Sequence, residues 1–381
     1  MIERFISFCN QLYLLFAYKV KMKDLRKSPR ILPSLIFFCI VLAVALRKKS
    51  MLEIDQISRT KAVRNFFKVQ RKMVVSDSTI FRSLSSFDFV PLHRYLKTIY
   101  LKAKQKGLCK VDVCGRELRL GCVDGSQFGT FYGSVFMLIG ETDLFLDIEA
   151  TENKGKELPA SRALIERVYH DYSAGFVDLI LFDGLYADKK TINMTVEHGS
   201  DVLIKTDEES LSIIKDAKGL FENWQEIHGV FYKKGFDIER MCDYEIWCSD
   251  GFTFNGVFKS MTVAHIQERY IKNELQADFW VLCTDESLNM SHLRELGHIR
   301  WEIENNGFKQ LNSQTNCDHV YTHLSHSFLA LMLILFIGWN LFALFSLSEN
   351  LTEDYEGVKI TYGFISELLK ISFFTEYADS S

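Results

Sequence analysis

Hydrophobic positions are spaced differently in the first part of the chain and in the rest of it. Up to residue 72 the spacing predicts helices: an amphipathic opening, a basic connector from Lys19 to Arg30, an apolar helix over 31–46 and a basic helix over 53–72. Beyond residue 110, short apolar runs predict strands, and the amphipathic segments between them predict helices. The chain therefore combines a helical beginning with a larger α/β part.

The α/β part has a recognisable order of elements. The predicted elements are strands over 118–123, 136–139 and 144–150, a helix over 161–172, a strand over 177–182, a helix over 189–198 and a strand over 202–205. A hairpin followed by strands that alternate with helices predicts a mixed α/β sheet. Residues 206–275, with Asp250-Gly251 as a hairpin turn, are predicted to be a β-rich insertion. A strand over 277–283 then resumes the sheet, and a helix over 292–311 follows.

A short capped helix is predicted near the end of the helical beginning. Ser76 or Asp77 can cap it, and apolar residues follow at positions 80, 81 and 84. We interpret it as the second helix of a helix-turn-helix near residues 60–86, whose amino-terminal half would reach base edges and phosphates. Short capped helices are also common outside DNA-binding proteins. The side chains placed for DNA contact are Ser78, Thr79 and Arg82.

Two stretches are apolar enough to raise the question of a membrane. Ile31–Leu46 is short for a membrane span and is basic on both sides. Ser327–Leu347 runs 21 residues without a charge, but no Lys or Arg lies close to either end and Asn340 lies within it. Both are predicted to be buried core helices. A two-span membrane protein with an acidic soluble domain is the alternative from another class.

Charge is divided unevenly along the chain. Residues 1–110 carry 23 Lys and Arg against 6 Asp and Glu, a net charge of +17, whereas residues 111–381 carry 22 against 43, a net charge of −21. A basic block of this size suits a polyanion such as DNA, and an acidic remainder suits a domain that binds divalent cations. The other interpretation is that the two parts neutralise each other. With 48% hydrophobic residues and 4 prolines, the chain is not a disordered or collagen-like protein.

The nine cysteines include no C-x-x-C pair and are predicted to be reduced and mostly buried, as in a cytoplasmic protein. No signal-peptide pattern is present at the start, so we expect no export. One Cys and three His residues have a spacing that can bind zinc, although DNA contact or the capping of a buried surface explains them equally well. They are Cys317, His319, His323 and His326.

Three acidic residues occupy positions that structure alone does not require. Asp124 and Asp183 each follow a predicted strand directly, and Glu304 lies in the predicted helix over 292–311. Acids at the carboxyl ends of neighbouring strands converge at one edge of a sheet, where ligands bind in open α/β folds. Three such carboxylates can hold two Mg²⁺ or Mn²⁺ ions for phosphodiester chemistry. The alternative is that both Asp-Gly pairs are turns and that Glu304 is a solvated helix residue.

Three motifs around these acids carry a resemblance to a known family. They are Cys122-Val123-Asp124-Gly125-Ser126, Leu181-Phe182-Asp183-Gly184-Leu185-Tyr186 and Arg300-Trp301-Glu302-Ile303-Glu304-Asn305. Over about residues 30–345 the chain resembles the DDE transposases of bacterial insertion sequences, which have an RNase H-like fold with a β insertion before the last acid. The resemblance implies that Asp124, Asp183 and Glu304 bind metal and are catalytic, with Arg300 and Tyr186 as supporting groups.

The third motif departs from the family pattern of Tyr, two residues, Arg, three residues, Glu, six residues and Lys. Arg300 and Glu304 fit the Arg-to-Glu spacing, but Gly297 stands at the Tyr position and Lys309 comes two residues before the Lys position. Glu302 with Lys309 fits the Glu-to-Lys spacing instead. We expect Glu304 to be the acid, because its context matches and Arg300 would lie on the same helix face. The resemblance implies a contact of this Lys with the DNA end, for which Lys309 is the candidate, and the displaced Lys also fits a decayed copy.

Residues and resemblance together predict a transposase that cuts at the ends of its own element and joins the freed 3′-hydroxyls to target DNA. We expect two Mg²⁺ or Mn²⁺ ions and no small-molecule cofactor. The expected partner is double-stranded DNA, both terminal inverted repeats and target, bound by a dimer in the bacterial cytoplasm at the nucleoid, without a membrane. A nuclease of the same fold and an inactive copy that still binds DNA are alternatives.

The same reasoning predicts how the chain is divided into domains. The expected parts are a helical, basic DNA-binding region over 1–110, the first part of an RNase H-like catalytic domain over 111–205, a β-rich insertion over 206–275, the rest of the catalytic domain over 276–348 and a C-terminal tail over 349–381.

Overall fold

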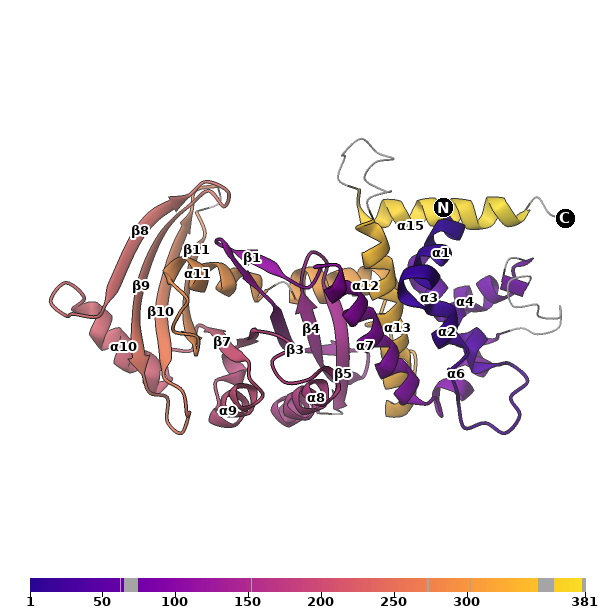
Figure 1. Ribbon diagram of the computed structural model, residues 1–381, viewed down its shortest axis with the longest axis horizontal. Helices are drawn as coiled ribbons and strands as arrows, with labels where there is room; N and C mark the ends of the chain where they lie inside the picture. The colour runs from indigo at the N-terminus through magenta and orange to yellow at the C-terminus, as the bar shows by residue number, and fades with distance from the viewer. Residues whose placement is uncertain are drawn as a thin grey trace. The chain divides into compact units, whose positions relative to one another are not determined.

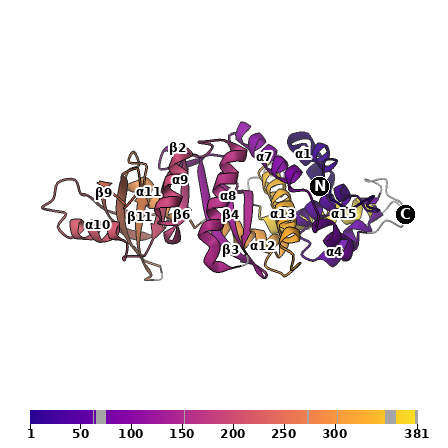
Figure 2. The same ribbon diagram turned by 90° about the horizontal axis from the view of Figure 1, so that it is seen from below.

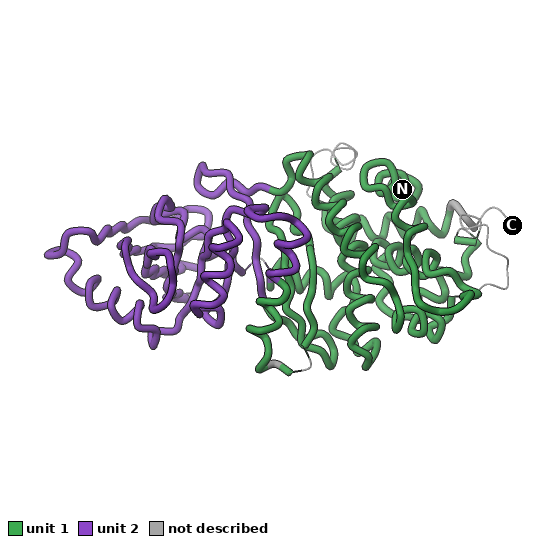
Figure 3. Tube along the Cα trace, turned by 60° about the horizontal axis from the view of Figure 1, so that its bottom comes forward, with its two compact units in different colours: residues 1–109, 125–164, 304–381 green, residues 110–124, 165–303 purple. Residues whose placement is uncertain are grey.

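The computed structural model describes residues 1–61, 63–64, 75–151, 153–272, 274–301, 303–348 and 360–378. The chain forms two compact units (Figure 3). Unit 1 consists of residues 1–109, 125–164 and 304–381, and unit 2 consists of residues 110–124 and 165–303. Both units contain helices and strands, so the mixed α/β class predicted from the sequence is confirmed (Figure 1).

The elements follow the chain in the order labelled in Figure 1. The helices are α1 (Ile2–Tyr13), α2 (Leu15–Lys19), α3 (Pro33–Ala45), α4 (Met51–Ser58), α6 (Asp77–Leu84), α7 (Phe89–Gln105), α8 (Glu157–Tyr172), α9 (Lys189–Glu197), α10 (Ser212–Glu222), α11 (Met290–Ile299), α12 (Lys309–Thr315), α13 (Ser325–Ser346) and α15 (Tyr362–Ala378). The strands are β1 (Val111–Val113), β2 (Arg116–Leu118), β3 (Leu120–Phe128), β4 (Phe131–Ile139), β5 (Leu144–Thr151), β6 (Leu179–Asp183), β7 (Asp201–Thr206), β8 (Phe231–Asp237), β9 (Cys242–Phe252), β10 (Met261–Tyr270) and β11 (Gln276–Cys283). Short 3₁₀ turns cover Lys154–Lys156 and Gly184–Tyr186, and a π-helix covers Ile303–Phe308.

The sheet of unit 2 is mixed. Its strands are hydrogen-bonded in the order β3-β6-β7-β11-β10-β9-β8. β6 runs parallel to β3 and β7, whereas β11 pairs antiparallel with β7 and the strands of the insertion continue antiparallel from it. Along the chain, β3, β4 and β5 come first, and β6 and β7 each follow a helix. This is the element order expected for an RNase H-like fold.

The predicted β-rich insertion forms helix α10 and strands β8, β9 and β10. Phe221 of α10 stacks on Trp280 of β11, and Gly297 of α11 approaches Phe279, the preceding residue of the same strand. Because adjacent residues of a strand point to opposite faces, α10 and α11 cover opposite faces of this part of the sheet. The strands of the insertion therefore extend the sheet of unit 2, and this part of the sheet is covered by a helix on each face.

Among the element boundaries that differ from the prediction, three concern the candidate acids or the insertion. β3 runs over Leu120–Phe128 and so passes through Asp124. β9 continues through Asp250-Gly251, which forms a bulge held by a 2.5 Å hydrogen bond from Thr262 to Asp250 instead of a hairpin turn. The predicted helix over 292–311 consists of α11, the π-helix and α12. In the first two cases, Gly125 and Gly251 were taken as turn signals, but each lies within a strand.

Helix α13 lies at the centre of unit 1. It packs against α3, α7 and β5, which are labelled near it in Figure 1, and Figure 2 also shows α7 beside it. Its one amide side chain, Asn340, accepts a 2.9 Å hydrogen bond from the N–H of Phe145 and donates a 2.8 Å bond to the carbonyl oxygen of Phe145. Phe145 lies where the register between β4 and β5 shifts. Asn340 therefore supplies partners for strand backbone at an irregular point of the sheet.

One helix in the described part of the chain is long and apolar enough to cross a membrane, namely Ser325–Ser346. Within its most apolar window, 94% of the residues are buried inside the protein. The shorter apolar helix Pro33–Ala45 is buried along almost its whole length. The burial predicted for both stretches is thus confirmed.

The capped helix predicted near residue 80 is α6. Ser76 is its N-cap, and the Ser76 hydroxyl accepts a hydrogen bond from the N–H of Thr79. Ile80 and Leu84 are buried beneath it. Residues 65–74, on which the first helix of the predicted helix-turn-helix falls, lie outside the described residues, so that motif stays a prediction.

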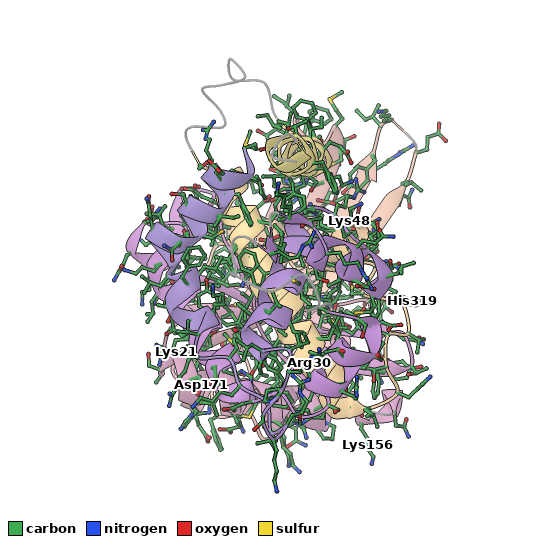
Figure 4. All side chains as sticks on the ribbon, turned by 90° about the vertical axis from the view of Figure 1, so that its right-hand side faces the viewer. Lys21, Arg30, Lys48, Lys156, Asp171 and His319 are labelled. Atoms are coloured by element: carbon green, nitrogen blue, oxygen red, sulfur yellow. The ribbon has the colours of Figure 1, made fainter. Side chains whose placement is uncertain are left out.

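Lys and Arg side chains of the helical beginning are distributed over unit 1. Lys21 and Arg30 are exposed, Lys48 is half-buried, and the three lie apart from one another in Figure 4. The expected C-terminal tail contains α15, which the sequence analysis missed. Its residues Ile365 and Leu369, four positions apart, are buried, so the helical spacing was present in the sequence.

Candidate active site

Two acidic residues lie at the same level of two parallel strands in unit 2. Cys122 of β3 pairs in register with Leu181 of β6, and Asp124 and Asp183 each lie two residues further along. Since residues i and i+2 of a strand share a face, both carboxylates project from one face at the carboxyl edge of the sheet. Asp124 and Gly125 both lie inside β3, so the interpretation of this pair as a turn is wrong.

Arg300 joins the two aspartates. It follows α11 as its C-cap, and its side chain is only 4% exposed. Its Nη2 atom lies 3.2 Å from Oδ2 of Asp124 and 3.3 Å from Oδ2 of Asp183. The thiol of Cys122 donates a hydrogen bond to the Arg300 carbonyl oxygen at 3.7 Å, which holds this end of the helix to β3. A single guanidinium nitrogen thus bridges both acids.

Local backbone fixes the orientation of Asp183. Its Oδ1 atom accepts a 3.0 Å hydrogen bond from the N–H of Leu185, which caps the 3₁₀ turn and leaves Oδ2 directed to Arg300. A Cβ atom at Gly184 would lie 3.0 Å from Cβ of Thr206, so only glycine lets this turn pass so close to β7. The Asp183 side chain is 37% exposed and that of Asp124 is 9% exposed. Asp183 is therefore the acid that solvent reaches more easily.

Tyr186, a predicted supporting group, is fully buried. Its ring lies 5.0 Å from that of Phe182, the residue before Asp183. The buried ring of Tyr186 packs beneath the turn that follows Asp183 and leaves no exposed surface for DNA. Its role as a supporting group stays a prediction.

The two aspartates fit a divalent metal ion by the chemistry of their atoms. Carboxylate oxygens are the ligands that Mg²⁺ and Mn²⁺ prefer. One oxygen from each acid already converges on the same cationic nitrogen, so the guanidinium of Arg300 stands where a cation is stabilised. Over the described ranges of the chain, no group of three or more His, Cys, Asp or Glu side chains is arranged to hold a metal ion. Two carboxylates are thus what the structure brings together here.

The Cys and His residues after α12 give no support to the zinc interpretation. Cys317 is buried, whereas His319 and His323 are exposed. His326 donates from Nε2 to the carbonyl oxygen of Phe87 at 2.9 Å. None of them belongs to a set of three metal ligands in the part of the chain that the structure describes.

Glu304 lies in the π-helix and is exposed. It is the first residue of unit 1 after unit 2, so its approach to the two aspartates stays a prediction. Glu302, the rival acid, is outside the described residues. Lys309 begins α12, and its Nζ atom donates a 2.5 Å hydrogen bond to Oδ1 of Asn305. A π-helix bonds residues five positions apart, which brings Lys309 closer to the helix face of Glu304 than α-helical spacing would.

Gly297 stands where the family pattern has Tyr, and the structure gives a physical reason. A Cβ atom at this position would lie 2.9 Å from Cε2 of Phe279 and 3.4 Å from Cγ2 of Val281. Helix α11 therefore packs too closely on β11 for any side chain at position 297.

Two further residues at this edge of the sheet were not found from the sequence. Lys205 of β7 pairs in register with Asp183, and its Nζ atom lies 4.0 Å from the ring centre of Trp301 and 4.1 Å from that of Phe279. Trp301 directly follows Arg300 and is 51% exposed. Two aromatic rings thus hold a cation next to the acids. Its place in the sequence could have indicated Lys205. It is the last residue of its predicted strand, and Asp183 directly follows the preceding predicted strand.

The predicted DNA contacts of α6 lie in unit 1. Ser78 and Arg82 are exposed, Thr79 is half-buried, and Nε of Arg82 donates a 3.1 Å hydrogen bond to the carbonyl oxygen of Ser78. Their side of the helix is opposite Ile80 and Leu84 and faces solvent. Contact with DNA stays a prediction for all three.

Comparison with known proteins gives one family. The family model described as "Transposase DDE domain" matches residues 125–341, which is more than half of the chain. The matched stretch begins one residue after Asp124 and includes Asp183, Arg300 and Glu304. No curated protein matches the chain.

Proposed function

The chain belongs to the transposase DDE domain family, and from this premise we propose that it cuts DNA at the ends of a mobile element and joins the freed 3′-hydroxyls to target DNA. Transposition and DNA recombination belong to the family, and the two chemical steps are the proposal for this chain. The observation that carries it is the convergence of Asp124 and Asp183 on one buried cationic group at the carboxyl edge of β3 and β6.

In this proposal Asp124 and Asp183 bind divalent metal, with Glu304 as the third acid and two Mg²⁺ or Mn²⁺ ions in all. Bound there, the metal ions activate the attacking water or 3′-hydroxyl and stabilise the departing oxygen. The turn at Leu185 keeps one oxygen of Asp183 occupied and the other directed into the site. Arg300 and Lys205 supply positive charge for the phosphate oxygens of the strand that reacts.

Recognition of the element ends falls to the basic region over 1–110 in this proposal, because its net charge of +17 suits the DNA backbone. Ser78, Thr79 and Arg82 of α6 contact the terminal inverted repeats, and Lys309 contacts the DNA end. Two ends have to be joined in one event, so the chain acts as a dimer on DNA. It works on the bacterial nucleoid in the cytoplasm, without a membrane or a small-molecule cofactor.

The test uses a labelled linear duplex that carries the sequences flanking this reading frame. Wild-type protein and Asp183→Ala are incubated with it and Mg²⁺ or Mn²⁺, and the products are separated on a denaturing gel. Metal-dependent joined products from the wild type alone support transposition. Cut but unjoined products would instead indicate a nuclease of the same fold.

A decayed copy is the other outcome that the experiment distinguishes. Such a protein would shift the labelled duplex in a binding assay but would neither cut nor join it with either metal. That result would overturn the proposed activity and leave DNA binding by the basic region as the function.

A further inference from the structure

We propose that Arg300 is an internal counter-ion that keeps divalent metal out of the site until DNA is bound, so that metal binding and DNA binding are coupled through this one side chain. The inference rests on the proposed function, since it takes Asp124 and Asp183 as metal ligands. It concerns the order in which the site is assembled and not the reaction itself.

The geometry makes Arg300 and a metal ion compete for the same atoms. Nη2 of Arg300 lies 3.2 Å from Oδ2 of Asp124 and 3.3 Å from Oδ2 of Asp183. A bound Mg²⁺ needs oxygen ligands at about 2.0–2.1 Å, and in this proposal it takes these two oxygens, which already converge on one point. Two cations that share the same oxygens repel each other, and burial weakens the screening between them. The guanidinium therefore has to leave when the metal ion enters.

In this proposal the Arg300 side chain moves while its backbone stays in place. The Arg300 carbonyl oxygen is tied to β3 by Cys122. Arg300 is the C-cap of α11, and the π-helix begins three residues later at Ile303, so Arg300 lies at a break between two helical segments. With Cα held, rotation of the long Arg side chain moves the charge away from the acids.

A DNA phosphate is the partner suited to receive Arg300. A guanidinium binds phosphate oxygens in the same two-pronged geometry as carboxylates. A phosphate at the edge of the sheet would draw Arg300 from the aspartates and leave two negative charges for the metal ion. By reciprocity, metal binding would free Arg300 and strengthen DNA binding by the same factor. Without DNA, the site would hold metal only weakly.

The test measures Mn²⁺ binding by isothermal titration calorimetry, with and without the duplex that carries the flanking sequences. For the wild type we expect the duplex to tighten Mn²⁺ binding on the order of tenfold, within the usual range for coupled sites. Arg300→Gln should bind Mn²⁺ on the order of tenfold more tightly than the wild type without DNA, and the duplex should then add little. Arg300→Lys keeps the charge and should lie between the two.

Arg119→Gln is the matched control, because Arg119 pairs with Asp178 at the opposite ends of the same two strands. It should behave as the wild type. The proposal is overturned if Arg300→Gln and Arg300→Lys bind Mn²⁺ no more tightly than the wild type, or if they keep the full effect of DNA. Asp183→Ala separates this failure from failure of the metal site, since Mn²⁺ binding that survives in Asp183→Ala contradicts the proposed function itself.

Discussion

The two ends of strands β3 and β6 each carry an arginine that reaches across to an aspartate, yet the two arrangements differ. At the amino end, Arg119 directs its backbone N–H, Nε and Nη2 to Asp178 and its Nη1 to the carbonyl oxygen of Phe176. At the carboxyl end, one nitrogen of Arg300 is shared by Asp124 and Asp183. At the amino end several donors of one arginine reach one acid, whereas at the carboxyl end one arginine nitrogen is shared by two acids.

The balance of charge is what separates the two ends. Arg119 and Asp178 neutralise each other, and their side chains are 28% and 37% exposed, so this pair works as a partly solvated clamp. Arg300 faces two carboxylates with one positive charge and is almost fully buried. Asp124 is 9% exposed and Asp183 is 37% exposed, and burial of a carboxylate costs free energy unless a cation or hydrogen bonds compensate it. The comparison thus supports the proposal that a metal ion binds at the carboxyl end.

The largest predicted effect comes from neutralising Asp183 at the carboxyl end of β6. Asp183→Asn should lower cleavage by more than about a thousandfold, because a metal ligand is lost, while binding of the labelled duplex is retained. Asp178→Asn changes the same strand in the same way and should leave the cleavage rate within about twofold of the wild type. Initial rates on the duplex, normalised to folded protein, measure both. Similar losses in the two variants would remove the distinction between the ends.

Glu304→Ala tests which acid completes the carboxyl end. It should abolish cleavage to a similar extent as Asp183→Asn, whereas Glu302→Ala should keep appreciable activity, because only one of the two acids can serve as a metal ligand beside the aspartates. The same gel assay measures both variants, with DNA binding as the control for folding. Equal losses would leave the choice of Glu304 unsupported, and the reverse order would assign the role to Glu302.

Arg119→Gln tests the clamp at the amino end and should have the smallest effect. Partial burial raises the pKa of Asp178, but hydrogen bonds from the side chain and N–H of Arg119 outweigh it and lower that pKa below its usual value. A lowered pKa stabilises the folded state above pH ~4, and this contribution is lost as the pH falls through the folded-state pKa. At neutral pH the substitution should cost about 1 kcal/mol or less, since the pair is partly exposed.

Urea unfolding of the wild type and Arg119→Gln, followed between pH 3 and pH 7, measures this effect. The difference in the free energy of unfolding should shrink below pH 4. A difference that stays constant over this range would mean that Arg119 acts through packing of its side chain and not through its charge.

The sequence was informative where one pattern determines one structure. Alternation of strands and helices predicted the fold of the sheet, and the positions of Asp124 and Asp183 after apolar runs predicted the edge at which they meet. Asp124 was nevertheless expected beyond β3, because the glycine that follows it is a turn signal. Inside β3, Gly125 is an ordinary strand residue whose missing side chain leaves room for the carboxylate of Glu157.

Other features depend on tertiary contacts that no local pattern carries. The close approach of Gly297 to Phe279, the stacking of Lys205 on Trp301 and the shared nitrogen of Arg300 all join segments distant in sequence. In the π-helix, residues five positions apart are hydrogen-bonded instead of four. The α-helical spacing assumed from the sequence therefore did not give the correct position of Lys309 relative to Glu304 on the helix surface.

The packing of α3 against α13 has a consequence for how the chain is made. Both helices are apolar on nearly all sides and belong to unit 1, yet about 280 residues separate them, and all of unit 2 is encoded in between. At typical rates of synthesis, α3 leaves the ribosome about 15–60 s before α13 is complete. During this interval its apolar surface lacks its main partner, so a nascent chain of this protein should depend on chaperones until nearly its last helix has emerged.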